Sequence, residues 1–130
     1  MKEKPQNNGY EIDLANLEAG KSGEDIAVDY LISKNYEIIK RNFRFGKSGE
    51  IDIICRDKNI LVFVEVKTRK NESYGDALLS ITPTKIKHLK IAARGYLYIN
   101  KIENTDCRFD AIVVEMNYEP SRVRHLENII

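Results

Sequence analysis

The sequence predicts an α/β fold in which helices flank a central mixed β-sheet. Two apolar segments, 49–57 and 60–67, are separated only by Lys58 and Asn59, which predicts two antiparallel strands joined by a tight turn. Two segments have helical periodicity, one from roughly residue 17 or 22 to residue 34 and the other over 83–100. The connections among the first three strands are too short for crossovers, so these strands form an antiparallel meander. The second helix is long enough to return a fourth strand parallel to the third.

Length and composition limit the class of protein. A chain of 130 residues suffices for one domain with a buried core, and we expect a mobile N-terminal arm over 1–15 and a single domain over 16–130. No apolar run approaches the ~18–20 residues that span a bilayer, and the polar residues 1–8 lack a signal-peptide core, so we expect a cytoplasmic protein without a membrane partner. The net charge of +1 argues against a strongly basic nucleic-acid-binding domain but permits a local basic strip.

The first helix is predicted to start either near Leu17 or at Ser22, and with the later start Ser22 can form a capping box with Asp25. Glu24 then lies on the apolar side of the helix, facing the sheet. An acidic side chain near a helix start is favoured by the helix dipole, and this is the simpler explanation of Glu24. Residues 36–45 follow as the first strand. The apolar stripe of the helix consists of Ala27, Val28, Tyr30 and Leu31.

Pairing across the two-residue turn places two acidic residues, Asp52 and Glu65, directly opposite each other. Directly opposed like charges destabilise a strand pair, and a buried unpaired charge costs several kcal/mol. A hard divalent cation such as Mg²⁺, bound through one or two carboxylates, would offset that cost. The other face of the hairpin is apolar throughout and is expected to be core; it carries Ile51, Ile53, Cys55, Val62, Val64 and Val66.

Lys67 lies on the acidic face, two residues beyond Glu65, where its ammonium group can face a reacting group. The same register places Glu50 opposite Lys67. A plain salt bridge between these two residues is therefore an open alternative, and it would make Lys67 structural.

Asp52 followed by Glu65-Val66-Lys67 on the next strand resembles the D…(D/E)-x-K signature of the restriction-endonuclease-like, PD-(D/E)XK nuclease superfamily. A wider set of segments is similar to the YraN-like family of small bacterial proteins, within the Holliday-junction-resolvase-like branch. The resemblance covers roughly residues 17–115. The segments that carry it are Gly23–Asp25, Tyr36–Asn42, Gly49–Asp52, Phe63–Lys67 and Thr82–Lys85.

The resemblance implies a restriction-endonuclease-like fold and a metal-dependent nuclease that hydrolyses phosphodiester bonds in DNA, in particular branched or damaged DNA. It implies Mg²⁺ or Mn²⁺ at Asp52 and Glu65, with Glu24 completing the coordination, and Lys67 orienting water or stabilising charge. Junction-cleaving relatives act as dimers, so a homodimer is implied as well. Two alternatives stay open: a nucleic-acid-binding protein of the same fold with little or no cleavage, and a non-catalytic scaffold.

Basic side chains near the end of the first strand, after the third strand and along the second helix are candidate contacts for nucleic-acid phosphates. An ordinary solvated surface is the open alternative for those on the first strand and on the second helix. Lys85 matches a lysine of the family pattern and is expected closest to the site. The candidates are Arg41, Arg44, Arg69, Lys85, Lys87, Lys90 and Arg94.

The C-terminal part is predicted to add a fourth strand over 107–116 and an edge strand over 121–126. Asp110, inside the fourth strand, is expected to form a structural ion pair with Arg108 or a helix residue. The two cysteines, at 55 and 107, are expected to be reduced core residues. The two histidines, at 88 and 125, have no evident partner in the sequence.

Overall fold

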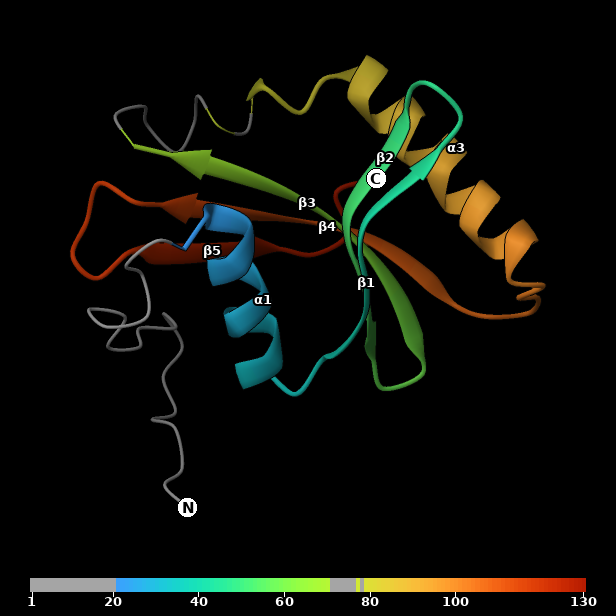
Figure 1. The fold of residues 1–130 in the computed structure, drawn as a ribbon, viewed down its shortest axis with the longest axis horizontal. Helices are drawn as coiled ribbons and strands as arrows, with labels where there is room; N and C mark the ends of the chain where they lie inside the picture. Colours follow the sequence, from blue (N-terminus) through green and yellow to red (C-terminus); the bar gives the residue numbers. More distant parts are fainter. Residues whose placement is uncertain (1–20, 71–76, 78) are drawn as a thin grey trace.

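The computed structural model describes residues 21–70, 77 and 79–130, so the arm predicted at 1–15 lies outside the described residues. Its five strands form one sheet in the order β1-β2-β3-β4-β5 (Figure 1). The first three strands are an antiparallel meander, β4 is parallel to β3, and β5 is antiparallel to β4. The predicted mixed α/β fold is confirmed. The elements are α1 (Gly23–Ser33), β1 (Glu37–Phe45), β2 (Gly49–Asp57), β3 (Ile60–Arg69), α3 (Pro83–Ile99), β4 (Cys107–Glu115) and β5 (Arg122–Leu126).

Each face of the sheet has its own core, because α1 and α3 lie on opposite sides of it (Figure 1). Helix α1 contacts β1, β3 and β4, whereas α3 packs on β1 and β2. The α1 core includes Leu31, Val64 and Ile112. The α3 core includes Phe63 and Leu89. Within the described residues, no helix combines the length and the apolar character that a membrane span requires.

Side-chain caps fix where both helices begin. Ser22 Oγ accepts a hydrogen bond from the Asp25 N–H and the Asp25 carboxylate accepts one from the Ser22 N–H, each at 3.1 Å, which confirms the predicted capping box. Thr82 caps α3 by accepting from the Lys85 N–H at 3.2 Å, ahead of Pro83. These caps place Glu24 in the first turn of α1 and Lys85 in the first turn of α3.

The register of the β2–β3 hairpin is confirmed from Asp57↔Ile60 to Ile53↔Val64. The predicted apolar face is wrong at one position, because Ile51 packs in the α3 core and not under α1. Beyond Ile53, β2 bends with β1 toward α3 while β3 continues beside β4 (Figure 1). This bend turns Ile51 to the other side and opens a fork between the two strands.

The C-terminal strands carry a buried charged network. Arg108 donates two hydrogen bonds to Asp110, at 2.9 and 3.0 Å, so the expected ion pair is confirmed. The expectation of an isolated His125 is wrong, because β5 folds back beside β4. His125 Nε2 lies 2.7 Å from Asp110 Oδ2, and its Nδ1 lies 2.9 Å from the Tyr30 hydroxyl. The network thus ties α1, β4 and β5 together.

The two cysteines differ in exposure, although both are free thiols. Cys55 is buried in the α1 core, as expected. The expected core position of Cys107 is wrong, because this residue is exposed at the first position of β4.

Candidate active site

The two acids predicted to lie directly opposite each other, Asp52 and Glu65, lie one position beyond the last paired residues, at the fork between β2 and β3. Just beyond the last paired residues, Ile53 and Val64, the Asp52 side chain takes over as hydrogen-bond acceptor. Its Oδ2 accepts from the Val66 N–H at 2.8 Å. A strand N–H without a ladder partner needs another acceptor, and the Asp52 carboxylate supplies it. The carboxylate is thereby held against β3, beside Glu65.

Glu65 is almost completely buried, with 3% of its side chain exposed. Its Oε2 lies 3.2 Å from Lys67 Nζ and 3.3 Å from Lys85 Nζ. Its Oε1 is buried and has no hydrogen-bond partner among the described residues. Leaving a buried carboxylate oxygen without a partner is costly, so a cation or a donor from a ligand would be stabilised at this atom.

The carboxylate of Asp52 is electrostatically disfavoured. Its pKa is raised from 3.8 to about 6, first by burial and second by the negative charge of Glu65. Glu24 raises it further, whereas the Val66 N–H and the Lys85 ammonium lower it. A half-buried acid whose pKa is raised by a neighbouring acid is typical of functional sites.

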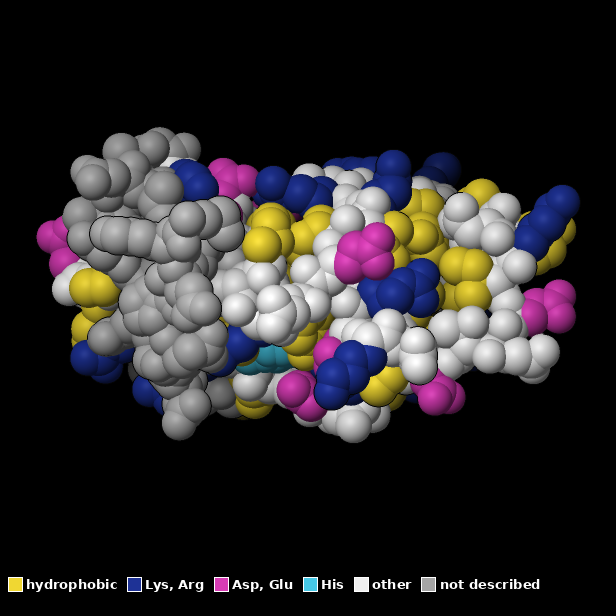
Figure 2. Space-filling model, turned by 90° about the horizontal axis from the view of Figure 1, so that it is seen from below, with side chains coloured by type: hydrophobic (Ala, Val, Ile, Leu, Met, Phe, Trp, Pro, Cys, Tyr) yellow, Lys and Arg dark blue, Asp and Glu magenta, His cyan; other side chains and the backbone are white. Residues whose placement is uncertain are grey.

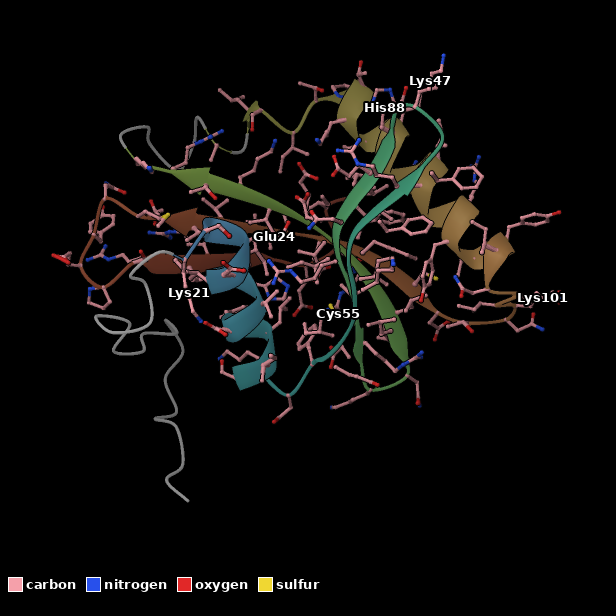
Figure 3. The ribbon with its side chains drawn as sticks, in the orientation of Figure 1. Lys21, Glu24, Lys47, Cys55, His88 and Lys101 are labelled. Carbon is pink, nitrogen blue, oxygen red and sulfur yellow. The ribbon has the colours of Figure 1, made fainter. Side chains whose placement is uncertain are left out.

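Glu24 lies on the first turn of α1, on the side that faces the strands (Figure 3). Its Oε1 accepts hydrogen bonds from Arg41 Nη2 at 2.7 Å, Arg41 Nε at 3.0 Å and Asn42 Nδ2 at 3.2 Å. Arg41 also bonds Asp25, at 2.7 Å. Glu24 therefore contributes charge to the site while β1 holds its carboxylate.

The start of α1 approaches β3 closely because residue 23 is glycine. A Cβ atom at Gly23 would overlap the Thr68 hydroxyl. Even so, no three His, Cys, Asp or Glu side chains within residues 21–70, 77 and 79–130 form a group that could hold one metal ion. The structure brings Asp52 and Glu65 together with two lysines and keeps Glu24 paired to Arg41.

The Asp52 and Glu65 carboxylates fit the needs of Mg²⁺ or Mn²⁺. A hard divalent ion uses oxygen ligands, commonly one or two carboxylates, and retains several waters. A cation would also pair the Glu65 oxygen that lacks a partner and would favour ionised Asp52. The donor set therefore suits a two-carboxylate site.

Lys67 belongs to this site, because its ammonium pairs with Glu65. Glu50 was predicted to lie opposite Lys67, but the β2–β3 pairing ends at Ile53 and Val64, and the Glu50 Oε2 instead lies 3.5 Å from Arg44 Nη2. The alternative of a salt bridge between Glu50 and Lys67 is therefore wrong, because Glu50 pairs with Arg44 and Lys67 pairs with Glu65. Lys85 joins the site from α3, as its place in the family pattern predicts.

The remaining basic candidates differ in their surroundings. Arg69 donates to the Thr68 carbonyl at 3.0 Å and to Ser80 Oγ at 3.1 Å, so it braces its own segment. Three side chains on α3 are exposed, as both the binding and the solvated-surface interpretations require. These are Lys87, Lys90 and Arg94. The face seen in Figure 2 mixes basic, acidic and hydrophobic side chains, in keeping with the small net charge.

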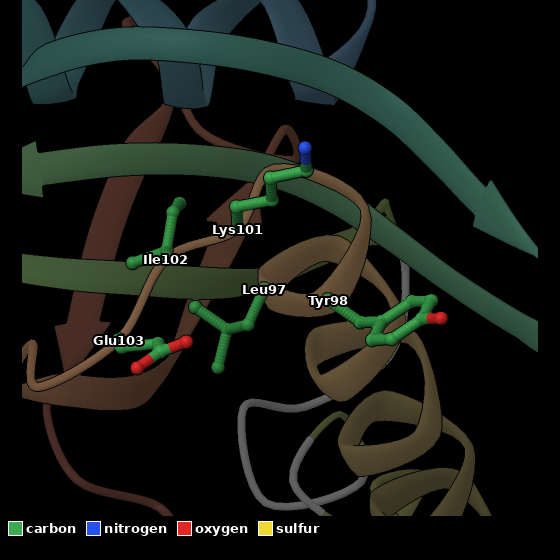
Figure 4. Close-up of a pocket in the computed structure, with 5 residues that line it drawn as sticks. All are labelled: Leu97, Tyr98, Lys101, Ile102 and Glu103. Carbon is green, nitrogen blue, oxygen red and sulfur yellow. The ribbon is translucent and has the colours of Figure 1, made fainter.

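Among the described residues, two pockets are found beside the C-terminal half of α3. The larger, of about 390 Å³, lies at the end of the helix and is lined by Leu97, Tyr98, Lys101, Ile102 and Glu103 (Figure 4). Tyr98 lies 13 residues after Lys85, or about 20 Å along the helix axis, so this pocket is separate from the acids. The smaller, of about 250 Å³, lies between α3 and the strands β3 and β4. It is called the inter-element pocket below.

Comparison with known proteins places the chain in a family. The profile described as "Uncharacterised protein family UPF0102" matches residues 23–114. The chain belongs to the UPF0102 family. A UPF0102 protein of Caldicellulosiruptor saccharolyticus is 47% identical over 100 residues, covering 77% of this chain and 84% of the relative. One from Thermodesulfovibrio yellowstonii is 41% identical over 115 residues, covering 88% and 97%.

A third UPF0102 relative, from Prosthecochloris aestuarii, is 41% identical over 109 residues and covers 83% of this chain and 85% of the relative. The segment matched by the UPF0102 profile includes every residue of the site described above. Two features were not predicted from the sequence: the hydrogen bond from Asn42 to Glu24 and the inter-element pocket. Neither leaves a local signal, because their partners come from elements distant in sequence.

Proposed function

We propose that this protein is a metal-dependent nuclease of the PD-(D/E)XK superfamily that hydrolyses phosphodiester bonds in DNA, with branched or damaged DNA as substrate. The observation that carries the proposal is the buried Glu65 carboxylate. One of its oxygens contacts two lysines and the other has no partner among the described residues, beside an Asp52 whose pKa is raised. Cytoplasmic location and action as a homodimer are part of the same proposal.

Each residue of the site has its own role in the proposed hydrolysis. Asp52 and Glu65 would hold Mg²⁺ or Mn²⁺, which when bound supplies charge stabilisation at the phosphate and lowers the pKa of water. Lys67 stabilises negative charge that develops on the phosphate, and Lys85 positions Glu65 and adds a second positive charge. Arg41 holds Glu24 in the first turn of α1, where the negative charge of Glu24 adds to the field that raises the pKa of Asp52.

A cleavage assay tests the proposal. Wild-type protein with Mn²⁺ is expected to cleave branched or single-stranded DNA, and Asp52→Asn and Glu65→Gln are expected to reduce cleavage to background. Lys67→Met is expected to reduce it by about 10²–10³-fold, the effect of removing one charge-stabilising donor. Glu103→Gln is the matched control, because Glu103 is an exposed acid in the separate pocket of Figure 4. Cleavage that survives Asp52→Asn contradicts the proposal.

A second candidate is a nucleic-acid-binding protein of the same fold without cleavage. The observation that favours it is that Lys67 and Lys85 both pair with Glu65, which already compensates part of its charge. Titration calorimetry with Mn²⁺ separates the two. Mn²⁺ binding by the wild type that is lost in both Asp52→Asn and Glu65→Gln supports the nuclease. DNA binding without any Mn²⁺ binding supports the second candidate, and no DNA binding at low salt supports a scaffold.

A further inference from the structure

The inter-element pocket has an apolar floor and a cationic rim. Two aromatic rings, Phe63 on β3 and Phe109 on β4, lie at the floor with their centroids 5.3 Å apart. Phe63 is 1% exposed, whereas Phe109 is partly accessible, so Phe109 offers the reachable ring. Ala93 and Leu97 of α3 form the wall, and Cys107 completes the lining.

The rim carries the positive charge. Lys90 and Arg94 are exposed, lie one helical turn apart on α3 and line the pocket. Among the described residues that line it, none is acidic. A volume of about 250 Å³ lies below the range of pockets for drug-sized ligands and suits one small ring system.

The pocket adjoins the candidate active site. Phe63 lies two residues before Glu65 on β3, so the two side chains point to the same face about 7 Å apart. Phe109 is the cross-strand neighbour of Phe63, and Ala111 is that of Glu65. A base in the pocket and a phosphate at Glu65 would therefore lie on the same face of the sheet, over neighbouring positions of β3.

We propose that the inter-element pocket binds one unpaired base of a single-stranded nucleic-acid segment adjacent to the phosphodiester at Asp52 and Glu65. This inference rests on the proposed function for the identity of the ligand. An aromatic platform flanked by cations is how proteins bind single strands, because bases stack on the ring while Lys and Arg contact the neighbouring phosphates. A base paired within a duplex is stacked and is not available to the pocket.

Binding of a fluorescein-labelled single-stranded DNA, followed by anisotropy in EDTA on an Asp52→Asn background, tests the proposal. Phe109→Leu keeps the apolar bulk but removes the ring, and Arg94→Gln removes a rim charge. Each is expected to weaken single-strand binding about tenfold, within the range for loss of one base–aromatic stack or one phosphate contact. The matched controls Tyr98→Leu and Arg122→Gln are expected to bind unchanged, because both residues are exposed outside the pocket.

The chemistry of the ligand is tested in the same assay. Phe109→Leu is expected to leave unchanged the binding of a duplex and of an oligonucleotide that lacks bases. Equal binding of the intact strand by Phe109→Leu and its parent overturns the proposal, and so does an equal loss on the strand without bases.

The unsubstituted chain supplies a second measurement that does not depend on how variants fold. Cys107 is exposed on the pocket lining, whereas Cys55 is buried. Single-stranded DNA is expected to slow alkylation of Cys107 at least about fivefold, the lower end of what one stacked base contributes. An unchanged alkylation rate at saturating DNA overturns the proposal.

Cleavage by the chain without the Asp52→Asn change separates this inference from the proposed function. Asp52-dependent cleavage with unaltered binding by Phe109→Leu overturns the base pocket alone. Phe109-dependent binding without Asp52-dependent cleavage supports the pocket and overturns the nuclease.

Discussion

Asp52 sits where ionisation opposes folding. Burial and the adjacent Glu65 charge raise the pKa of Asp52 from 3.8 to about 6, so the charged form is less stable in the folded than in the unfolded chain. Functional carboxylates commonly reduce stability in this way. Asp52 in its ionised form thus lowers the stability of the fold, and the same negative charge is suited to binding a cation.

Replacing Asp52 is therefore expected to stabilise the protein at neutral pH in the absence of divalent ions. The penalty from ionisation is absent below about pH 4, grows between pH 4 and 6 and is complete above pH 6. Asp52→Asn is expected to raise the free energy of unfolding by on the order of 1–3 kcal/mol at pH 8 and by little near pH 3.5. Urea unfolding at both pH values measures this, with the exposed Asp106→Asn as control. An equal effect at both pH values would refute the electrostatic explanation.

At the scale of the elements, features that depend on neighbouring residues were predicted better than features that depend on long-range contacts. The polar break at Lys58 and Asn59 fixed the hairpin register, and Ser22 and Thr82 fixed the helix starts, because each signal acts within a few residues. The side to which Ile51 points depends on how β2 bends toward α3, which no local pattern encodes.

In the candidate site, too, the residues were predicted but a contact that depends on tertiary packing was not. Asp52, Glu65, Lys67 and Lys85 follow from strand register and family pattern, and the structure brings them together. The hold of Arg41 on Glu24 joins residues 17 positions apart, on elements whose packing angle the sequence does not reveal.

Asp110 on β4 is a buried charge that links β4 to β5 through His125. Burial alone would raise the pKa of Asp110, but hydrogen bonds from His125, Arg108 and the Asn128 N–H outweigh it and lower the pKa. Stability from this group is therefore present above the carboxyl's unfolded pKa of 3.8 and is lost as the pH falls through the lower folded value.

Asp110→Ala is expected to destabilise the fold by about 3–5 kcal/mol, because it leaves the Arg108 guanidinium largely buried without its main partner. Asp57→Ala removes a more exposed partner of the same arginine, at 3.4 Å, and is expected to change stability by less than about 1 kcal/mol. Thermal unfolding at pH 7 compares the two. Similar losses would show that Asp110 is no more important than a surface partner.

At the scale of the whole molecule, a nearly neutral chain would have to bind a polyanion through a local concentration of charge. The net charge is only +1, but α3 carries a strip of exposed cations. The strip consists of Lys87, Lys90 and Arg94. Electrostatic attraction from such a strip is short-ranged and is screened by salt. Affinity for nucleic acid is therefore expected to be strong only at low ionic strength.

Salt dependence measures that strip directly. Each phosphate contact on a single strand contributes about 0.7 to the slope of log K against log salt concentration. Neutralising three cations of α3 is expected to lower the slope by about 2, if each contacts one phosphate. The variant combines Lys87→Gln, Lys90→Gln and Arg94→Gln.

The control changes the net charge by the same amount elsewhere on the surface. It combines Lys58→Gln, Lys101→Gln and Arg122→Gln, all at exposed positions. Its slope is expected to match that of the wild type. Equal slopes in the two triple variants would mean that overall charge, and not the strip, governs binding.

The hydrogen bond from the Val66 amide to Asp52 Oδ2 gives the molecule an intrinsic spectroscopic probe. In a ¹⁵N-correlated NMR spectrum the resonance of that amide proton should titrate with a midpoint near pH 6, following the charge on its acceptor. Added Mn²⁺ should broaden the same signal before most others, since the paramagnetic ion would sit next to the acceptor. A single backbone resonance would thus report both protonation and cation occupancy without any label at the reacting groups.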